Sequence, residues 1–289
     1  MSENRTHRSA PQNAASADPA RPLQGWRVVI TRSEDRADGL ADQLRALGAE
    51  PIVYPTIMFA PPEDWGLVDA ALQRLLAGAY DWLVLTSVTA VQAVQERLAI
   101  LTGPALAAAL PRLHIATVGP ATAAACTELL GISPALVPEK FVAEALAEAL
   151  AAPEAGPAQG LQGQRILLAN ADLARLKLEE MLRAGGAIVE RVVVYRTVPA
   201  RGGVDLPALL AQGQVDVITF TSGSTVRYFV DRIGPAALSA AHQVLIACIG
   251  PITAEAARSL GLTPTIVARR FTEAGLLEAL VEYASASER

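Results

Sequence analysis

The sequence predicts an α/β protein in which two related halves each form a doubly wound parallel sheet. Three observations predict this fold: short apolar runs alternate with amphipathic segments, the apolar runs contain few polar residues, and the two halves repeat the same motifs in the same order. Near-continuous apolar runs are typical of strands that are buried on both faces, and such strands need helices on both sides of the sheet. A chain of 289 residues is long enough for two domains that each have a core.

Eight apolar runs are predicted as strands of the two sheets. They are residues 27–31, 52–54, 82–85, 114–117, 165–169, 188–194, 216–220 and 244–248. Amphipathic segments between them predict helices, for example residues 37–47, which end before Gly48, and residues 173–184, which end before two glycines. Prolines flank two further extended segments, 55–61 and 195–199, which we interpret as exposed connecting strands because proline suits sheet edges and junctions.

The repeat is visible in several ordered matches between the halves. Residues 80–91 align with 214–226, and residues 115–123 (Ile-Ala-Thr-Val-Gly-Pro-Ala-Thr-Ala) align with 246–254 (Ile-Ala-Cys-Ile-Gly-Pro-Ile-Thr-Ala). The match continues through Gly131, Pro134, Val137 and Phe141 against Gly261, Pro264, Val267 and Phe271, and a weaker echo relates 25–48 to 163–186. Matches at nearly constant offset indicate an internal duplication. The stretch 151–164, which is rich in Ala, Gly, Pro and Gln, links the two halves.

Composition excludes several classes of function. A net charge of −5 and an aromatic content of 4% argue against a nucleic-acid partner. The first 24 residues contain no apolar stretch, so they predict a disordered tail, and no uncharged run is long enough to span a membrane. Cys126 and Cys248 form no CxxC pair, which favours two free, buried thiols in a cytoplasmic protein, and the three histidines are too scattered for a metal site.

The pair Gly119-Pro120 and its twin Gly250-Pro251 each follow a predicted strand and open a predicted helix. Proline suits the first helical position, and the next N–H groups stay free at the positive end of the helix dipole. With Thr122 or Thr253 nearby, each start is a candidate anion site. The alternative is that Gly-Pro only turns a strand into a helix.

Thr86-Ser87 and Thr221-Ser222 also end strands and begin helices. Ser87 and Ser222 are therefore candidate N-caps, candidate ligand contacts, or both, because ligands bind beyond the carboxyl ends of parallel strands. The sequence has no GxGxxG segment, no phosphate-binding Gly-Lys-Ser/Thr loop and no GxSxG elbow. We therefore expect no cofactor, no metal and no strong nucleophile, and an enzyme of this kind has to position a substrate that is already reactive.

In their order and spacing these segments resemble the uroporphyrinogen-III synthase family, from about Gly25 to Tyr283. The resemblance is carried by 28–32 (Val-Val-Ile-Thr-Arg), Thr86-Ser87, 118–123 (Val-Gly-Pro-Ala-Thr-Ala), 194–198 (Val-Tyr-Arg-Thr-Val), 220–222 (Phe-Thr-Ser) and 249–254 (Ile-Gly-Pro-Ile-Thr-Ala).

The resemblance implies two doubly wound domains joined by a two-stranded β-ladder that acts as a hinge. It places residues 25–56 and 200–289 in one discontinuous domain, residues 62–192 in the other, and residues 57–61 and 193–199 in the connecting strands, with residues 1–24 as a tail. We expect the substrate to bind in the cleft between the domains.

The resemblance also implies a reaction. Hydroxymethylbilane, a linear tetrapyrrole with eight carboxylates, would lose its terminal hydroxyl and close through a spiro intermediate with its last ring inverted. Tyr195 matches the family's tyrosine beside the hinge and could donate a proton to the leaving hydroxyl, or it could simply pack at the ladder. The expected substrate contacts are Thr122, Thr253, Ser87, Ser222, Gly119, Gly250 and Arg32, although Arg32 could equally be an exposed surface residue.

We expect a cytoplasmic monomer that needs no cofactor and makes at most transient contact with the preceding pathway enzyme. Two other functions fit parts of the pattern. A non-catalytic two-domain binding protein for an anionic metabolite would have the same fold and the same cleft. A glycosyl or sugar-phosphate enzyme would want a carboxylate or basic cluster at the strand ends, and the sequence offers no convincing one.

Overall fold

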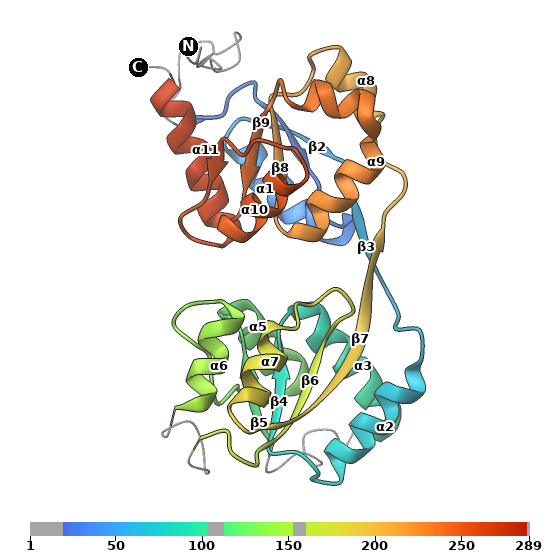
Figure 1. Ribbon diagram of the computed structural model, residues 1–289. Helices are drawn as coiled ribbons and strands as arrows, with labels where there is room; N and C mark the ends of the chain where they lie inside the picture. The colour runs from blue at the N-terminus through green and yellow to red at the C-terminus, as the bar shows by residue number, and fades with distance from the viewer. Residues whose placement is uncertain (1–19, 103–112, 153–159, 288–289) are drawn as a thin grey trace. The chain divides into compact units, whose positions relative to one another are not determined.

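The computed structural model describes residues 20–102, 113–152 and 160–287. The chain divides into two compact units: unit 1 contains residues 1–58 and 198–289, and unit 2 contains residues 59–197. The chain passes from one unit to the other at residues 58–59 and 197–198, within strands β3 (Ile57–Ala60) and β7 (Ile188–Pro199), which are neighbours in one sheet (Figure 1).

Unit 1 is a five-stranded parallel sheet in the order β10-β9-β8-β1-β2, with helices on both faces (Figure 1). Its elements are β1 (Arg27–Ile30), the 3₁₀ turn η1 (Glu34–Arg36), α1 (Ala37–Ala46), β2 (Glu50–Val53), α8 (Leu206–Ala211), β8 (Val217–Phe220), α9 (Gly223–Ala241), β9 (Leu245–Cys248), α10 (Pro251–Ser259), β10 (Ile266–Val267) and α11 (Glu273–Ser287). One core lies between the sheet and helices α1 and α11, and the other lies between the sheet and helices α8, α9 and α10.

Unit 2 has a five-stranded sheet in the order β3-β7-β6-β4-β5, and β7, β6, β4 and β5 pair in parallel. Its other elements are α2 (Trp65–Leu76), β4 (Trp82–Leu85), α3 (Val88–Thr102), β5 (His114–Thr117), α5 (Pro120–Ala125), the π-helical turn η3 (Cys126–Leu130), α6 (Ala143–Ala151), β6 (Arg165–Ala171) and α7 (Lys177–Ala184). Helices α2, α3 and α5 cover one face, and helices α6 and α7 cover the other. The predicted fold class is confirmed.

The strand orders of the two units are consistent with the internal duplication. In unit 2 the series β5-β4-β6-β7 corresponds to β9-β8-β1-β2 of unit 1, and an isolated bridge between Ala116 and Leu136 stands where β10 pairs with β9. The first residues of corresponding strands also make the same contacts. Asp216 accepts the Arg27 N–H at 2.8 Å in unit 1, and Asp81 accepts the Arg165 N–H at 2.8 Å in unit 2.

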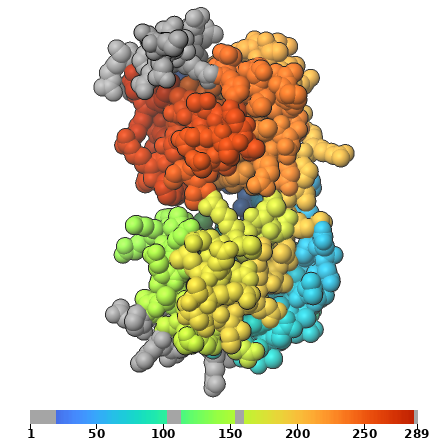
Figure 2. Space-filling model, viewed as in Figure 1, coloured from blue at the N-terminus to red at the C-terminus, as the bar shows by residue number. Residues whose placement is uncertain are grey.

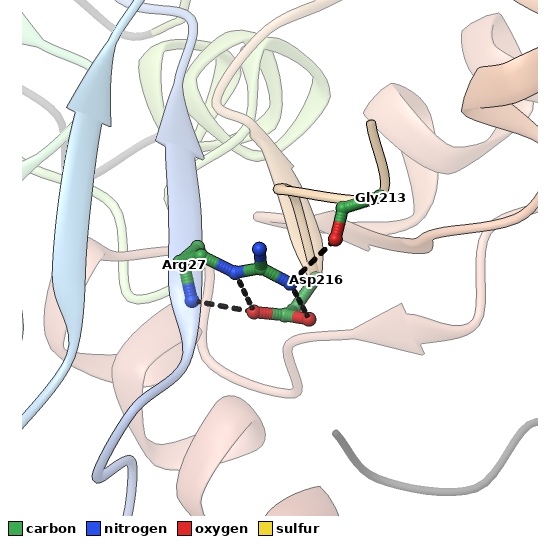
Figure 3. A network of polar contacts seen from close by, with 3 residues as sticks. All are labelled: Arg27, Gly213 and Asp216. Atoms are coloured by element: carbon green, nitrogen blue, oxygen red, sulfur yellow. Dashed lines mark hydrogen bonds and ion pairs between the residues drawn. The ribbon is translucent and has the colours of Figure 1, made fainter. Parts of the chain in front are cut away.

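In unit 1 this contact includes the arginine side chain. The Arg27 guanidinium donates to both carboxylate oxygens of Asp216, each at 2.9 Å, and to the Gly213 carbonyl at 2.7 Å (Figure 3). The hydrogen bond to Asp216 raises the pKa of Arg27 above its ordinary value. Two parallel charge-assisted bonds fix both the distance and the angle between their partners. They therefore hold the start of β1 against the start of β8, although the two residues lie 189 positions apart in the chain.

β1 is covered as well as paired. Val28, Val29 and Ile30 are fully buried, with β2 along one edge and β8 along the other. In the face of the molecule shown in Figure 2, the orange and red segments that follow β8 form most of the visible surface of unit 1, and little of the blue N-terminal segment can be seen. Burial on both faces explains why this strand consists of apolar residues after Arg27.

Some predicted boundaries differ from the observed ones. The predicted segments 188–194 and 195–199 are one continuous strand, β7, because no turn residue interrupts the extended run at Val194. β10 was not predicted, since its two residues owe their extended form to pairing with β9 rather than to a local pattern. α7 begins at Lys177, four residues later than predicted, because the preceding segment forms a loop in which Asp172 accepts the Thr197 N–H at 2.9 Å.

The predicted tail (1–24) and linker (151–164) lie largely outside the described residues. Where they are described, two of their side chains are buried: Leu23 packs in the core of unit 1, and Leu161 packs in the core of unit 2. Regular packing in unit 1 therefore begins by Leu23, before residue 25.

We predict that Asp216→Asn lowers the free energy of unfolding by about 1–2 kcal/mol, because it removes the charge from two hydrogen bonds in a partly buried pair. The side chains of Arg27 and Asp216 are 30% and 12% exposed. Urea unfolding followed by circular dichroism measures the change. Asp42→Asn is the control, because the Asp42–Arg45 pair is exposed on α1 and should stabilise little. An Asp216 variant no less stable than the Asp42 variant would contradict the prediction.

Candidate functional site

The predicted site residues lie at the carboxyl edges of the two sheets. In each unit the strands that carry them are parallel, so the segments that follow those strands share one edge. Helices begin directly beyond β4, β5, β8 and β9, at Val88, Pro120, Gly223 and Pro251. Unit 2 contributes Ser87, Gly119, Thr122 and Tyr195, and unit 1 contributes Arg32, Ser222, Gly250 and Thr253.

In unit 2 the fold brings Ser87 and Tyr195 together. The Ser87 Oγ lies 3.1 Å from the Tyr195 hydroxyl oxygen, and it accepts the Ala90 N–H, also at 3.1 Å. Tyr195 lies on β7 opposite Ala171, the last residue of β6, so its side chain starts at the carboxyl end of the sheet. The Phe59 ring packs edge to face against the Tyr195 ring at a centroid distance of 5.4 Å. The partly exposed phenol is therefore positioned by a hydroxyl and by an aromatic ring.

Ser222, the counterpart of Ser87, has a different set of partners. It caps α9 through the Thr225 N–H at 3.2 Å, and the Thr225 hydroxyl is 3.2 Å from the Ser222 N–H, which completes a capping box. Its Oγ lies 2.9 Å from the Ser224 Oγ. Both serines therefore have the structural role predicted for an N-cap, and only Ser87 is bonded to a tyrosine.

The two Gly-Pro segments form helix starts of similar geometry. Gly119 and Gly250 are extended N-cap residues, and each carbonyl accepts the N–H four positions on, at 3.0 Å. The N–H groups of residues 121–122 and 252–253 come before that first bond, so they have no partner within their helices. Pro120, Ala121, Pro251 and Ile252 are exposed, which leaves the positive end of each helix dipole at the surface.

Thr122 and Thr253 are the third residues of α5 and α10, and they are only 6% and 4% exposed. Their side chains are therefore largely buried at the helix starts, and the exposed surface there consists of the proline and the residue after it. The backbone N–H groups are the more accessible hydrogen-bond donors at these two sites.

Arg32, just beyond β1, forms an ion pair with Glu273 in the first turn of α11. Its side chain is 15% exposed, so it is not the exposed surface residue that the sequence left as an alternative. The pair joins the carboxyl end of β1 to the start of the C-terminal helix. A substrate carboxylate would have to share this guanidinium with Glu273.

Sequence reasoning missed three residues near these helix starts. Phe141 and Phe271 lie against the two N-cap glycines: a Cβ added at Gly119 would lie 3.5 Å from the Phe141 Cγ, and one added at Gly250 would lie 2.9 Å from the Phe271 Cδ1. Both phenylalanines appear in the repeat alignment, which was the available signal. The third is Thr117, the last residue of β5, and nothing in the sequence distinguishes it from the other strand threonines.

Comparison with known proteins identifies the family. A family model described as uroporphyrinogen-III synthase HemD matches residues 38–278. This chain belongs to the uroporphyrinogen-III synthase family. A uroporphyrinogen-III synthase of Synechococcus elongatus is 34% identical to it over 269 residues, which cover 91% of this chain and 97% of that protein. A porphyrin biosynthesis protein HemD of Ruminiclostridium josui is 31% identical over 91% of this chain, which spans 49% of that protein.

Solved structures of the uroporphyrinogen-III synthase family share the fold. A mutant enzyme from Thermus thermophilus superposes with a TM-score of 0.61 at 21% identity, covering 91% of this chain and 99% of that one. The Helicobacter pylori protein gives a TM-score of 0.52 at 13% identity, covering 90% of this chain and 100% of that one. The resemblance inferred from the sequence motifs is confirmed.

The two cysteines and the possible metal ligands are further candidates for chemically active groups. Burial raises the pKa of the Cys126 and Cys248 thiols to about 12, so both are protonated at neutral pH and neither is a nucleophile. Within the described ranges no group of three or more histidine, cysteine, aspartate or glutamate residues could hold a metal ion. No helix in the described part of the chain is both long and apolar enough to cross a membrane.

We predict that Thr117→Val raises the free energy of unfolding by about 1 kcal/mol. Among the described residues, the Thr117 Oγ1 is the buried side-chain polar atom that has no hydrogen-bond partner, and such an atom loses its hydration without compensation. Its repeat counterpart is Cys248, whose thiol needs hydrogen bonds less. Urea unfolding measures the effect.

Thr219→Val is the matched control for this prediction. The Thr219 Oγ1 is equally buried but donates to the Val29 carbonyl at 2.7 Å, so its loss should destabilise the protein. If both variants lose stability, the Thr117 hydroxyl is stabilising and the prediction is wrong.

Proposed function

We propose that this chain is a uroporphyrinogen-III synthase, which cyclises hydroxymethylbilane to uroporphyrinogen III with inversion of the terminal ring (ring D) and release of water. The observation that carries the proposal is the family match along residues 38–278, together with a uroporphyrinogen-III synthase that is 34% identical over 91% of this chain. A reaction that expels water and closes a ring makes the enzyme a cyclising hydro-lyase. We further propose that it works without a cofactor, as a cytoplasmic monomer in at most transient contact with the preceding pathway enzyme.

The proposed first step is departure of the terminal hydroxyl. Tyr195 donates its proton to that hydroxyl, the carbon–oxygen bond breaks, and water departs, which leaves the Tyr195 phenolate and an electrophilic azafulvenium cation. The contacts of Ser87 support this direction of transfer. Its Oγ accepts the Ala90 N–H, so its own proton is available to the Tyr195 oxygen at 3.1 Å, where it stabilises the developing phenolate.

The later steps depend on the conformation in which the substrate is held more than on strong catalytic groups. The methylene carbon of the azafulvenium cation bonds to the substituted α-carbon of the last pyrrole and forms a cationic spiro intermediate. The older bond between that pyrrole and its bridge breaks, and the bridge re-forms at the other α-carbon. When the ring regains its aromaticity it loses a proton, which restores Tyr195. Because the bilane closes without inversion on its own, the protein's contribution is to hold one conformation of a reactive substrate.

The two Gly-Pro helix starts are the proposed contacts for substrate carboxylates. The N–H groups after Gly119 and Gly250 lie at positive helix ends, with Thr122 and Thr253 beside them. A charge-assisted hydrogen bond contributes about 1.5–3 kcal/mol, so several outweigh the weak repulsion from a net charge of −5. Ser87, Ser222 and Arg32 complete the proposed set of contacts. Closure of the two domains over the substrate, about hinge strands 57–61 and 193–199, is part of the same proposal.

We predict that the purified protein converts freshly made hydroxymethylbilane into the type III isomer. The measurement is chromatography of the oxidised products, with heat-denatured protein as the control. A binding protein that does not catalyse the reaction would leave the spontaneous type I product. That outcome would reject the proposed function in favour of a receptor for an anionic metabolite.

We predict that Tyr195→Phe lowers kcat about 100-fold or more while KM changes little, because the phenol acts on the leaving group rather than on binding. Ser87→Ala should lower kcat about tenfold through loss of one hydrogen bond to that phenol. It should also cost about 1 kcal/mol of stability through loss of the α3 cap.

Asp64→Ala separates the two effects of Ser87. Asp64 caps α2 in the same unit by accepting the Gly66 N–H at 2.7 Å, as Ser87 caps α3. This control should lose a similar amount of stability and keep its kcat. A Tyr195→Phe variant within about threefold of wild type would show that Tyr195 is not the general acid.

A further inference from the structure

Two exposed aromatic side chains occupy equivalent places in the two units. Phe141 and Phe271 are 43% and 47% exposed, and they are the aromatic members of the set of exposed large apolar residues in the described part of the chain. Phe141 follows the segment that bridges to β5, and Phe271 follows β10, which pairs with β9. Each phenylalanine therefore belongs to the segment that follows the Gly-Pro helix in the chain, and it lies next to the N-cap glycine of that helix.

Each ring lies beside the first turn of one helix. Gly250 leaves room for Phe271, because a Cβ there would lie 2.9 Å from the Phe271 Cδ1, whereas a Cβ at Gly119 would make ordinary contact with Phe141. Both glycines have extended backbones that any residue adopts, so the constraint at Gly250 is the space taken by the ring and not a special φ value. An apolar ring surface and free N–H groups thus lie side by side at each carboxyl edge.

Burial of the core does not account for these two positions. Nearly half of each side chain is exposed, and a large aromatic gains most when its area is removed from water. Other apolar side chains lie close by in sequence to the same edges, including Ile252 next to Pro251 and Leu173 just after β6, both exposed. A repeated arrangement of an exposed ring and free backbone donors fits a ligand that has flat apolar faces and anionic arms.

We infer that Phe141 and Phe271 are substrate-binding residues, each of which packs against the face or edge of one pyrrole ring of the substrate. The inference rests on the proposed function, because a carboxylated pyrrole is the repeating unit of the proposed substrate. It assigns to each unit one platform of the same kind. It also accounts for glycine at position 250, where a Cβ would lie 2.9 Å from the Phe271 Cδ1.

The test is the steady-state kinetics of Phe141→Leu and Phe271→Leu with hydroxymethylbilane, scored as type III product. Leucine keeps the glycine covered but lacks the flat aromatic face, so we expect KM to rise roughly fivefold with kcat and the urea unfolding midpoint unchanged. Alanine at either position should raise KM about tenfold, because the apolar contact area is lost as well.

Ile188→Ala is the matched control. Ile188 is 62% exposed at the first residue of β7, at the opposite edge of the unit 2 sheet, and its loss should leave KM unchanged. Leucine variants that keep the wild-type KM would show that the rings only cover the glycines. Leucine variants whose KM rises only together with a lowered urea unfolding midpoint would show the same, and either result would overturn the inference. In that case wild-type formation of the type III isomer would leave the proposed function standing. A wild-type chain that makes no type III isomer would reject the proposed function and this inference together.

Discussion

The placement of β1 between β8 and β2 determines how the rest of the chain is arranged. This strand is hydrogen-bonded along both edges and buried on both faces, so it forms part of the interior of a sheet whose strands β8, β9 and β10 come from the C-terminal part of the chain. The Arg27–Asp216 pair aligns its first residue with the start of β8. Unit 1 therefore needs both ends of the chain. Residues 59–197 are set apart as a second, continuous unit, which the chain enters through β3 and leaves through β7.

Parallel pairing and duplication together explain why each unit carries a similar set of candidate site residues. Parallel strands bring their carboxyl ends to one edge, so each copy of the repeat places a serine cap and a Gly-Pro helix start at that edge. The copies then differ in what surrounds these shared features. The cap in unit 2 contacts Tyr195, whereas the cap in unit 1 contacts Ser224. A common backbone thus supplies the proposed anion donors twice, and the proposed proton donor, Tyr195, lies beside only one of the two serine caps.

The sequence predicted the elements whose pattern is local. The bounds of β4 and β5 were predicted correctly because β4 is a continuous apolar run that ends before a polar residue, and β5 is a short run that ends just before a Gly-Pro turn. β10 was missed because a strand of two residues is too short to show an alternation of apolar and polar side chains, and its extended form depends on pairing with β9. The same distinction holds for the site. Position at a strand end could be predicted for Ser87 and Gly250, but the partners of Ser87 and Arg32 lie far away in the chain and depend on packing. The exposure of Phe141 and the missing partner of Thr117 are likewise results of packing.

The candidate site residues include a phenol but no stronger acid, and this agrees with the reaction that is proposed. A pyrrole nitrogen can stabilise a cation on the attached methylene, so the terminal hydroxyl needs only modest assistance to leave. An ordinary phenol keeps its proton to about pH 10, so at neutral pH it is available as a donor, whereas an ordinary carboxyl group is already ionised. A strong acid would also promote departure of the hydroxyl before the last ring is in place, and closure would then follow the spontaneous route. The proposed donor is held by Ser87 and Phe59 at one position, so it would act only on a substrate that reaches that position, and correct placement of the bilane would be a condition of the reaction.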